Sequence, residues 1–224
     1  RRMADESTAG GPLIITWPAT TLEPPQVRTT RRRVIVVAWD LTHNPVGRAW
    51  VLAELAMRSA NCEIVGPLFP AYGDDLWGPL RETERPVEIR GFRAGSFADF
   101  LNGAIRLVEQ RPCDIALVSK PRLPSLLIGL LYKLIHGARL VLDIDDDELA
   151  FVGATDSLGL ADFIASTTAS DWQAPHDRRW TRLAASLVHA ADATTTCNPV
   201  LRQRFGGTIV RHARDQRLFA SAAA

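Results

Sequence analysis

The chain has 224 residues, of which 46% are hydrophobic, and this is enough to bury the core of one large domain. Its 26 Lys and Arg residues balance 25 Asp and Glu residues, so a formal net charge of +1 excludes bulk attraction to nucleic acid. The three separated cysteines suggest neither a disulfide framework nor a zinc site, and no apolar run reaches the ~20 residues that span a bilayer, so we expect a soluble, cytoplasmic protein with at most peripheral membrane contact.

The first half of the chain predicts a leader followed by a βαβ unit. Residues 1–30 combine glycine, proline and small polar residues and are interpreted as a flexible leader or linker. Residues 34–39 form a continuous apolar run, which is typical of a strand buried on both faces of a parallel sheet. After a loop over 40–47, apolar residues recur at helical spacing, and 62–65 is predicted to be a short strand that ends before Gly66 and Pro67.

The same alternation continues to the end of the chain. Helices are predicted over 97–110, 126–135, 180–189 and 199–205, and strands over 114–119, 139–143, 193–196 and 208–210. The polar segment 157–174 is interpreted as a mobile excursion. This order predicts an α/β fold, an open Rossmann-like parallel sheet sandwiched by helices, in which ligands bind at the carboxyl ends of the strands.

The loop after the first strand is the first candidate site. His43, Asn44, Gly47 and Arg48 lie there, and we interpret them as substrate-binding residues. A single glycine does not make the fingerprint of a dinucleotide cofactor, but it would let the backbone approach a ligand at the start of a helix. The alternative is structural, with Asn44 as a helix cap and Arg48 as an exposed helical residue.

An acidic cluster at the end of the 139–143 strand, from Asp143 to Glu148, is the second candidate site. Its five carboxylates include Asp145 and Asp146, which we predict to be catalytic. Gathering so many like charges is costly, so a role as a general base, as a divalent-ion site or as a helix cap is expected. Lys120 and Arg122 follow a neighbouring strand and are predicted either to pair with these carboxylates, to bind a phosphate on the substrate, or to be exposed loop cations.

The order of these pieces resembles the N-terminal domain of the family-four retaining glycosyltransferases of the GT-B fold. The matching segments are 33–37 with the loop 44–48, then 114–121, 137–146, 191–196 and the closing 206–215. The resemblance implies that 31–219 is an acceptor-binding domain, that a C-terminal domain would bind a nucleotide sugar, and that 220–224 begins a missing linker or second domain. It implies no metal and no other cofactor. Asp145 stands where many members have a histidine.

These observations leave several functions open. The chain is expected to be a glycosyltransferase when completed by a C-terminal domain and inactive alone, with an unidentified acceptor. A truncated, non-catalytic module that binds an acceptor or a partner is the main alternative. Asp143 and Asp145 also mimic the paired aspartates of haloacid dehalogenase-like phosphatases, as well as the Asp-x-Asp metal motif of GT-A enzymes.

Overall fold

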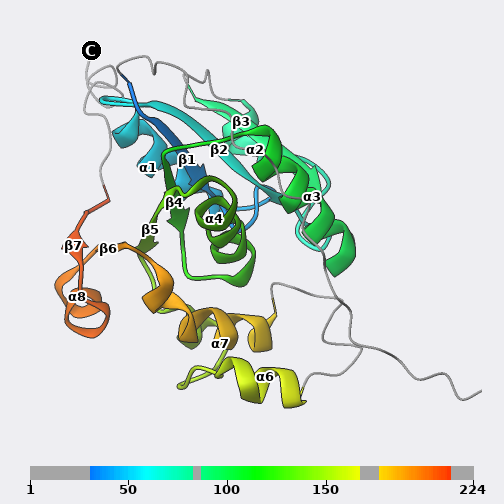
Figure 1. Cartoon of the computed structure of the whole chain (residues 1–224), viewed down its shortest axis with the longest axis vertical. Helices are drawn as coiled ribbons and strands as arrows, with labels where there is room; N and C mark the ends of the chain where they lie inside the picture. The colour runs from blue at the N-terminus through cyan, green and yellow to red at the C-terminus, as the bar shows by residue number, and fades with distance from the viewer. Residues whose placement is uncertain (1–30, 83–86, 167–176, 213–224) are drawn as a thin grey trace, which may run out of the picture.

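The computed structural model describes residues 31–82, 87–166 and 177–212, and its centre is one seven-stranded parallel sheet in the order β3-β2-β1-β4-β5-β6-β7 (Figure 1). The strands are β1 (Arg33–Val37), β2 (Asn61–Leu68), β3 (Glu88–Arg93), β4 (Ile115–Ser119), β5 (Arg139–Ile144), β6 (Ala193–Thr196) and β7 (Thr208–Ile209). The helices are α1 (Val46–Ala56), α2 (Gly78–Arg81), α3 (Phe97–Gln110), α4 (Leu123–His136), α5 (Glu148–Phe151), α6 (Leu160–Ser166), α7 (Arg178–Ser186) and α8 (Pro199–Phe205), with a 3₁₀ turn at Val188–Ala190. The predicted Rossmann-like fold is confirmed. The predicted leader, 1–30, and the predicted start of a second domain, 220–224, lie outside the described residues.

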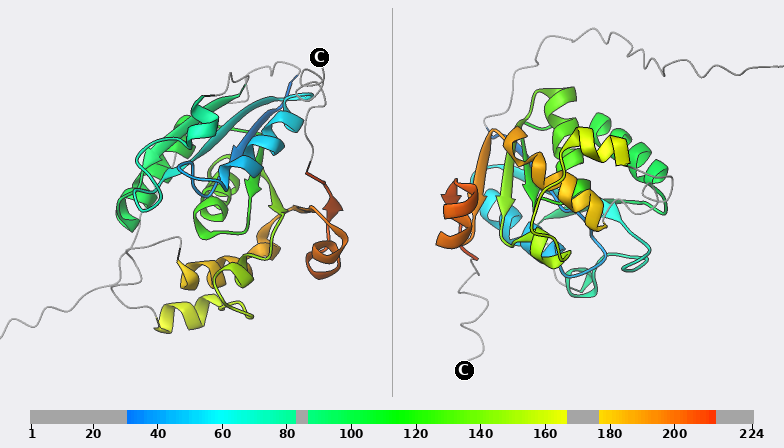
Figure 2. Two further views of the ribbon diagram at one scale, coloured as in Figure 1. Left: turned by 180° about the vertical axis from the view of Figure 1, so that it is seen from behind. Right: turned by 90° about the horizontal axis from the view of Figure 1, so that it is seen from below.

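Strand β1 is apolar on both faces because helices cover both sides of the sheet. Val34 and Val36 belong to a core that packs under α1, whereas Ile35 and Val37 belong to the core under α3 and α4. Figure 1 is seen from the α4 side, and the reverse view in Figure 2 shows α1 on the other face. Two covered faces explain why this strand reads as a continuous apolar run.

Strand β2 is longer than the sequence predicted, since it runs through Gly66 and Pro67 instead of ending before them. A Cβ atom on Gly66 would lie 2.7 Å from the carbonyl oxygen of Ala38, so only glycine fits where the two chains approach. Pro67 is paired with Phe92 of β3, beyond the end of the β1 ladder. Gly66 therefore allows two chain segments to approach closely, Pro67 lies within the strand, and neither residue marks a turn.

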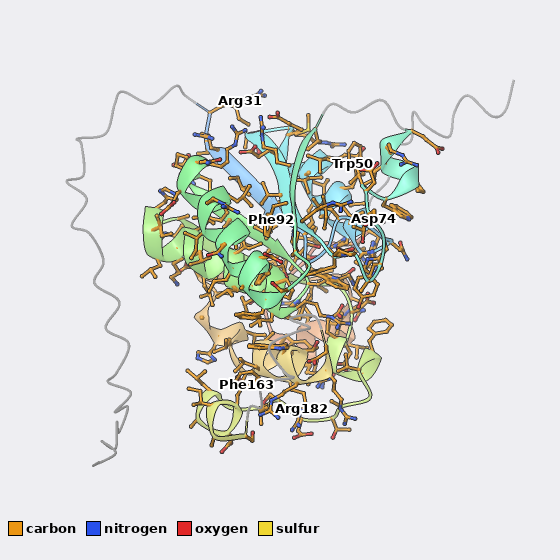
Figure 3. All side chains as sticks on the ribbon, turned by 90° about the vertical axis from the view of Figure 1, so that its right-hand side faces the viewer. Arg31, Trp50, Asp74, Phe92, Phe163 and Arg182 are labelled. Carbon is orange, nitrogen blue, oxygen red and sulfur yellow. The ribbon has the colours of Figure 1, made fainter. Side chains whose placement is uncertain are left out.

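The segment after β5 contains more helix than predicted. Helix α6 lies inside the stretch 157–174 that was interpreted as a mobile excursion, and the remainder of that stretch from 167 on is outside the described residues. Phe163 of α6 packs against Trp180 of α7 with ring centroids 4.5 Å apart, and Trp180 stacks on Phe97 at 4.9 Å. Figure 3 shows Phe163 at the end of the molecule that α6 and α7 form, away from the sheet. An apolar anchor holds this polar segment in place.

The predicted helix over 180–189 is divided. Helix α7 begins at Arg178, ends at Ser186 and is followed by the short 3₁₀ turn. Asp177 caps its start by accepting hydrogen bonds from the backbone N–H groups of Arg179 and Trp180. None of the described helices is long and apolar enough to span a bilayer.

Candidate functional site

A cleft of about 790 Å³ lies at the carboxyl ends of the strands. The loops after β1, β4 and β5 line it, together with side chains from α1, from the β2–β3 connection and from the segment after β7. Strands β1 and β4 are neighbours although β2 and β3 separate them in sequence, so the connections turn to opposite sides of the sheet at this point. Ligands of open α/β sheets bind at such a switch point. The cleft is lined by the predicted site residues His43, Asn44, Gly47, Arg48, Lys120, Arg122, Asp145 and Asp146 and also by Trp39, Trp50, Glu54, Tyr72, Trp77, Leu80, Glu148, Phe151 and His212.

The first loop is organised by the buried carboxylate of Asp40. Its Oδ1 accepts a hydrogen bond from the backbone N–H of Phe69, 3.0 Å away, and its Oδ2 accepts from the backbone N–H and the hydroxyl of Thr42. The same Oδ2 lies 2.5 Å from Nδ1 of His43. Because a carboxylate only accepts, Nδ1 of His43 carries a proton. In the neutral imidazole Nε2 is then an acceptor.

The His43 ring is also held by its neighbours. It stacks on Tyr72 with ring centroids 4.2 Å apart and meets the edge of Trp39 at 4.9 Å. These contacts and the bond to Asp40 fix both the position and the tautomer of the imidazole. The sequence pattern alone does not single out Asp40 or Tyr72. The signal for Asp40 was available, since it is the first acidic residue after the buried strand.

Arg48 lies in the wall of the cleft, but its donors are used within the protein. Its side chain is buried, and Nε and Nη2 donate to the two carboxylate oxygens of Asp143 at 2.8 and 2.9 Å. Nη2 also donates to the carbonyl of Val210 at 3.0 Å. Burial alone would lower the pKa of Arg48, but the hydrogen bond and the charge of Asp143 raise it above its ordinary value. Arg48 therefore ties α1 to β5 and to the segment after β7.

Asn44 and Gly47 both border the cleft, and Asn44 does not cap α1 as the structural alternative predicted. Helix α1 begins at Val46, its cap residue is Pro45, and the cap has no side-chain hydrogen bond. Asn44 is exposed, so its amide is open to a ligand. A Cβ atom on Gly47 would lie 3.8 Å from the Trp77 ring, which is an ordinary contact, so packing does not require glycine at this position.

Lys120 lies among three of the acidic side chains. Its Nζ is 2.9 Å from Oδ1 of Asp145, 2.6 Å from Oδ2 of Asp146 and 3.2 Å from Oε1 of Glu148. Burial would lower the pKa of Lys120, but the surrounding carboxylates raise it. Burial raises the pKa of Asp145, and the charge of Lys120 lowers it again in part, so that the net direction is upward. The backbone of Lys120 has a φ of +70°, in the left-handed region.

Arg122 completes the cluster. Its Nε pairs with Glu148, its Nη1 donates to the hydroxyl of Thr181 at 3.0 Å, and its guanidinium lies 5.1 Å from the centre of the Trp39 ring. Of the alternatives for Lys120 and Arg122, the structure supports pairing with the acidic cluster.

The same arrangement bears on the alternatives for the acidic cluster. Asp147 precedes α5 as its cap residue without a side-chain cap hydrogen bond, so neither Asp145 nor Asp146 caps this helix. Asp145, Asp146 and Glu148 place carboxylate oxygens within 4.8 Å of one another, as a metal site would, but a divalent ion would have to compete with the ammonium of Lys120. Asp143 is fully buried with both oxygens bonded to Arg48, which argues against a nucleophilic role of the phosphatase kind.

No protein-family model matches the chain, and no curated protein has a matching sequence. Among solved structures, the chain is similar to UGT2 of Phytolacca americana in complex with UDP-2-fluoro-glucose and pterostilbene, with a TM-score of 0.48 and 7% identity over 80% of this chain and 50% of that one. It is also similar to the PbgP3 protein of Burkholderia pseudomallei, with a TM-score of 0.34 and 12% identity over 75% of this chain and 52% of that one. The chain thus spans about half the length of both structures. Its own strand order, and not these similarities, establishes the Rossmann-like fold.

Proposed function

We propose that this chain is the acceptor-binding half of a glycosyltransferase of the GT-B type, of the family-four retaining kind, and that a C-terminal domain binds the nucleotide sugar. What supports the proposal is the cleft at the switch point of the sheet, which is lined both by aromatic side chains and by ordered polar groups. The first loop has no glycine-rich fingerprint for a diphosphate. In this proposal the donor's diphosphate is therefore bound by the other domain.

Within this proposal the polar groups of the cleft have separate tasks. His43, held by Asp40, accepts a hydrogen bond from an acceptor hydroxyl through Nε2. Asp146 is the most exposed carboxylate of the acidic cluster, with 44% of its side-chain surface accessible, and it orients the same hydroxyl. Asp145 is buried against Lys120 and acts through it by positioning Asp146. Asn44 binds the acceptor from the rim.

The function is tested by measuring nucleotide release and sugar transfer from a panel of nucleotide sugars. The chain alone is expected to be inactive, because transfer needs both substrates in one cleft. The chain joined to the domain encoded after it is expected to turn over. Transfer by the chain alone would contradict the division of labour. A gene without a following domain would favour the non-catalytic binding module.

The carboxylate is tested by Asp146→Asn in the two-domain protein. Asparagine keeps the shape of the side chain but cannot act as a charged acceptor, so turnover should fall by roughly 10²-fold or more with an unchanged melting temperature. The matched control is Asp147→Asn, since Asp147 is adjacent but pairs with Arg204 and does not line the cleft. Equal turnover of the two variants would remove Asp146 from the proposal.

A further inference from the structure

One wall of the cleft, which we call the aromatic wall, consists of Trp50, Glu54, Trp77 and Leu80. Trp50 and Glu54 are four residues apart on α1, so they lie on the same side of the helix. Trp77 immediately precedes α2, and its backbone N–H donates to the carbonyl of Leu41 at 2.9 Å. The Trp77 ring lies next to Gly47, where a Cβ atom would come within 3.8 Å of the ring.

The two tryptophan rings of this wall pack against the core under α1 with part of their surface and remain partly exposed. Trp39, deeper in the cleft, is covered by the Arg122 guanidinium and by the His43 and Tyr72 rings. Trp50 and Trp77 are only partly buried, and within the described segments neither contacts another ring or a cation. Partly exposed indole faces in a cleft can hold a flat ring by stacking or a cation by its attraction to the π system.

The charges of the cleft favour a cation over an anion. The cationic side chains that line it are Arg48, Lys120 and Arg122, and each is paired with a buried carboxylate. The one Arg48 donor without a described partner, Nη1, is itself buried and so is closed to a ligand. An incoming phosphate or carboxylate would have to displace an internal partner, at the cost of leaving a buried carboxylate unpaired.

Glu54 differs from these cations in its ion pairing. It lines the cleft, is partly exposed, and has no ion pair among the residues that the structure describes. Its carboxylate lies one helical turn from Trp50. A carboxylate beside exposed indole faces is a combination that suits an ammonium group, because both attract positive charge.

We propose that the acceptor of this cleft is a ring-containing, hydroxyl-bearing molecule with a cationic amine, and that the aromatic wall binds the ring and Glu54 the amine. This rests on the proposed function in calling the ligand an acceptor and in giving it a hydroxyl group. Trp50 and Trp77 supply the contact area. The paired state of Arg48, Lys120 and Arg122 disfavours acceptors that carry phosphate or carboxylate groups.

The test measures equilibrium binding of three probes to the full 224-residue chain by tryptophan fluorescence and by calorimetry. All three probes contain the same phenol ring and differ in the group at the end of a two-carbon chain. Tyramine carries an ammonium, 4-ethylphenol is neutral, and 3-(4-hydroxyphenyl)propionate carries a carboxylate. Tyramine should bind roughly tenfold more tightly than 4-ethylphenol, and the carboxylate probe should bind most weakly. Equal or tighter binding of the carboxylate probe would overturn the proposal.

Variants identify the groups responsible. Glu54→Gln should reduce tyramine binding to the level of 4-ethylphenol and leave 4-ethylphenol unaffected, whereas Trp50→Leu should weaken both. Glu109→Gln, on the exposed face of α3 and outside the cleft, is the matched control and should change neither. An unchanged tyramine preference in Glu54→Gln would refute the role of Glu54.

The outcomes separate this inference from the proposed function. Selective tyramine binding with no sugar transfer by the two-domain protein would sink the glycosyltransferase and leave the amine site standing. Transfer to anionic or neutral acceptors, without any preference for amines, would support the glycosyltransferase and refute the amine site.

Discussion

Replacing Lys120 by Gln isolates the charge at the centre of the acidic cluster. The change keeps an unbranched polar side chain that is one atom shorter, but it leaves Asp145 and Glu148 buried without their shared ammonium. Breaking a buried ion pair by removing one partner costs about 3–5 kcal/mol of the free energy of unfolding. For a domain of this size, each kcal/mol lowers the melting temperature by about 2–4 °C.

The loss should depend on pH in a defined direction. Burial already raises the pKa of Asp145 above its ordinary value, and removing the positive charge of Lys120 raises it further. A carboxyl whose pKa is raised by folding stabilises the protein when protonated, and this contribution is lost as the pH rises through the folded pKa. Lys120→Gln should therefore be closer to the wild type at pH 5 than at pH 8.

Urea unfolding followed by tryptophan fluorescence at the two pH values measures both effects. The control is Arg204→Gln, which removes a cation from the exposed pair with Asp147 and should cost less than about 1 kcal/mol at either pH. The role of Lys120 in holding the cluster together would be refuted if Lys120→Gln lowered the free energy of unfolding no more than this control does. It would also be refuted if the loss of free energy of unfolding were the same at pH 5 and at pH 8.

Three further outcomes follow from packing and burial. Gly47→Ala should leave the free energy of unfolding unchanged or raise it by up to about 1 kcal/mol in urea unfolding, because its Cβ meets only ordinary contacts and alanine favours the helix; a clear loss would mean that packing needs the glycine. Gly129→Ala should cost about 1–3 kcal/mol in the same assay, because a Cβ there would lie 2.4 Å from a methyl group of Val118; a neutral effect would refute this tight contact of α4 with the sheet. Burial raises the pKa of Cys113 to about 12, so at pH 8 iodoacetamide should label this thiol, as followed by mass spectrometry, only after denaturation. Rapid labelling of Cys113 in the native protein would contradict its burial.

The parts of the fold that the sequence predicts are those where the pattern of side chains reflects a local cause. Strand β1 is predicted because both of its faces are buried. Strand β3, with the sequence EIRGFR, is missed because it is an edge strand whose alternating charged residues face solvent. Helix α6 is missed because a single buried residue, Phe163, anchors it.

The candidate site was predictable in position and less so in its contacts. Both loops follow parallel strands, so the convergence of His43 with Asp146 at one sheet edge follows from topology. Which cation meets which carboxylate depends on side-chain packing between elements distant in sequence. Trp77 and Tyr72 enter the cleft from the connection between β2 and β3, which has no periodic pattern that would reveal it.

The clamp of Arg48 on Asp143 and Val210 also bears on how the molecule is assembled. These partners are 95 and 162 positions away along the chain, so the guanidinium finds them only after β5 and the segment beyond β7 have joined the sheet. Contacts of such long sequence separation form late in folding, because the closure entropy of the intervening chain must be overcome first. We therefore expect β1, β2 and α1 to associate early with Arg48 still hydrated, and the wall of the cleft at Arg48 to close among the last parts of the structure.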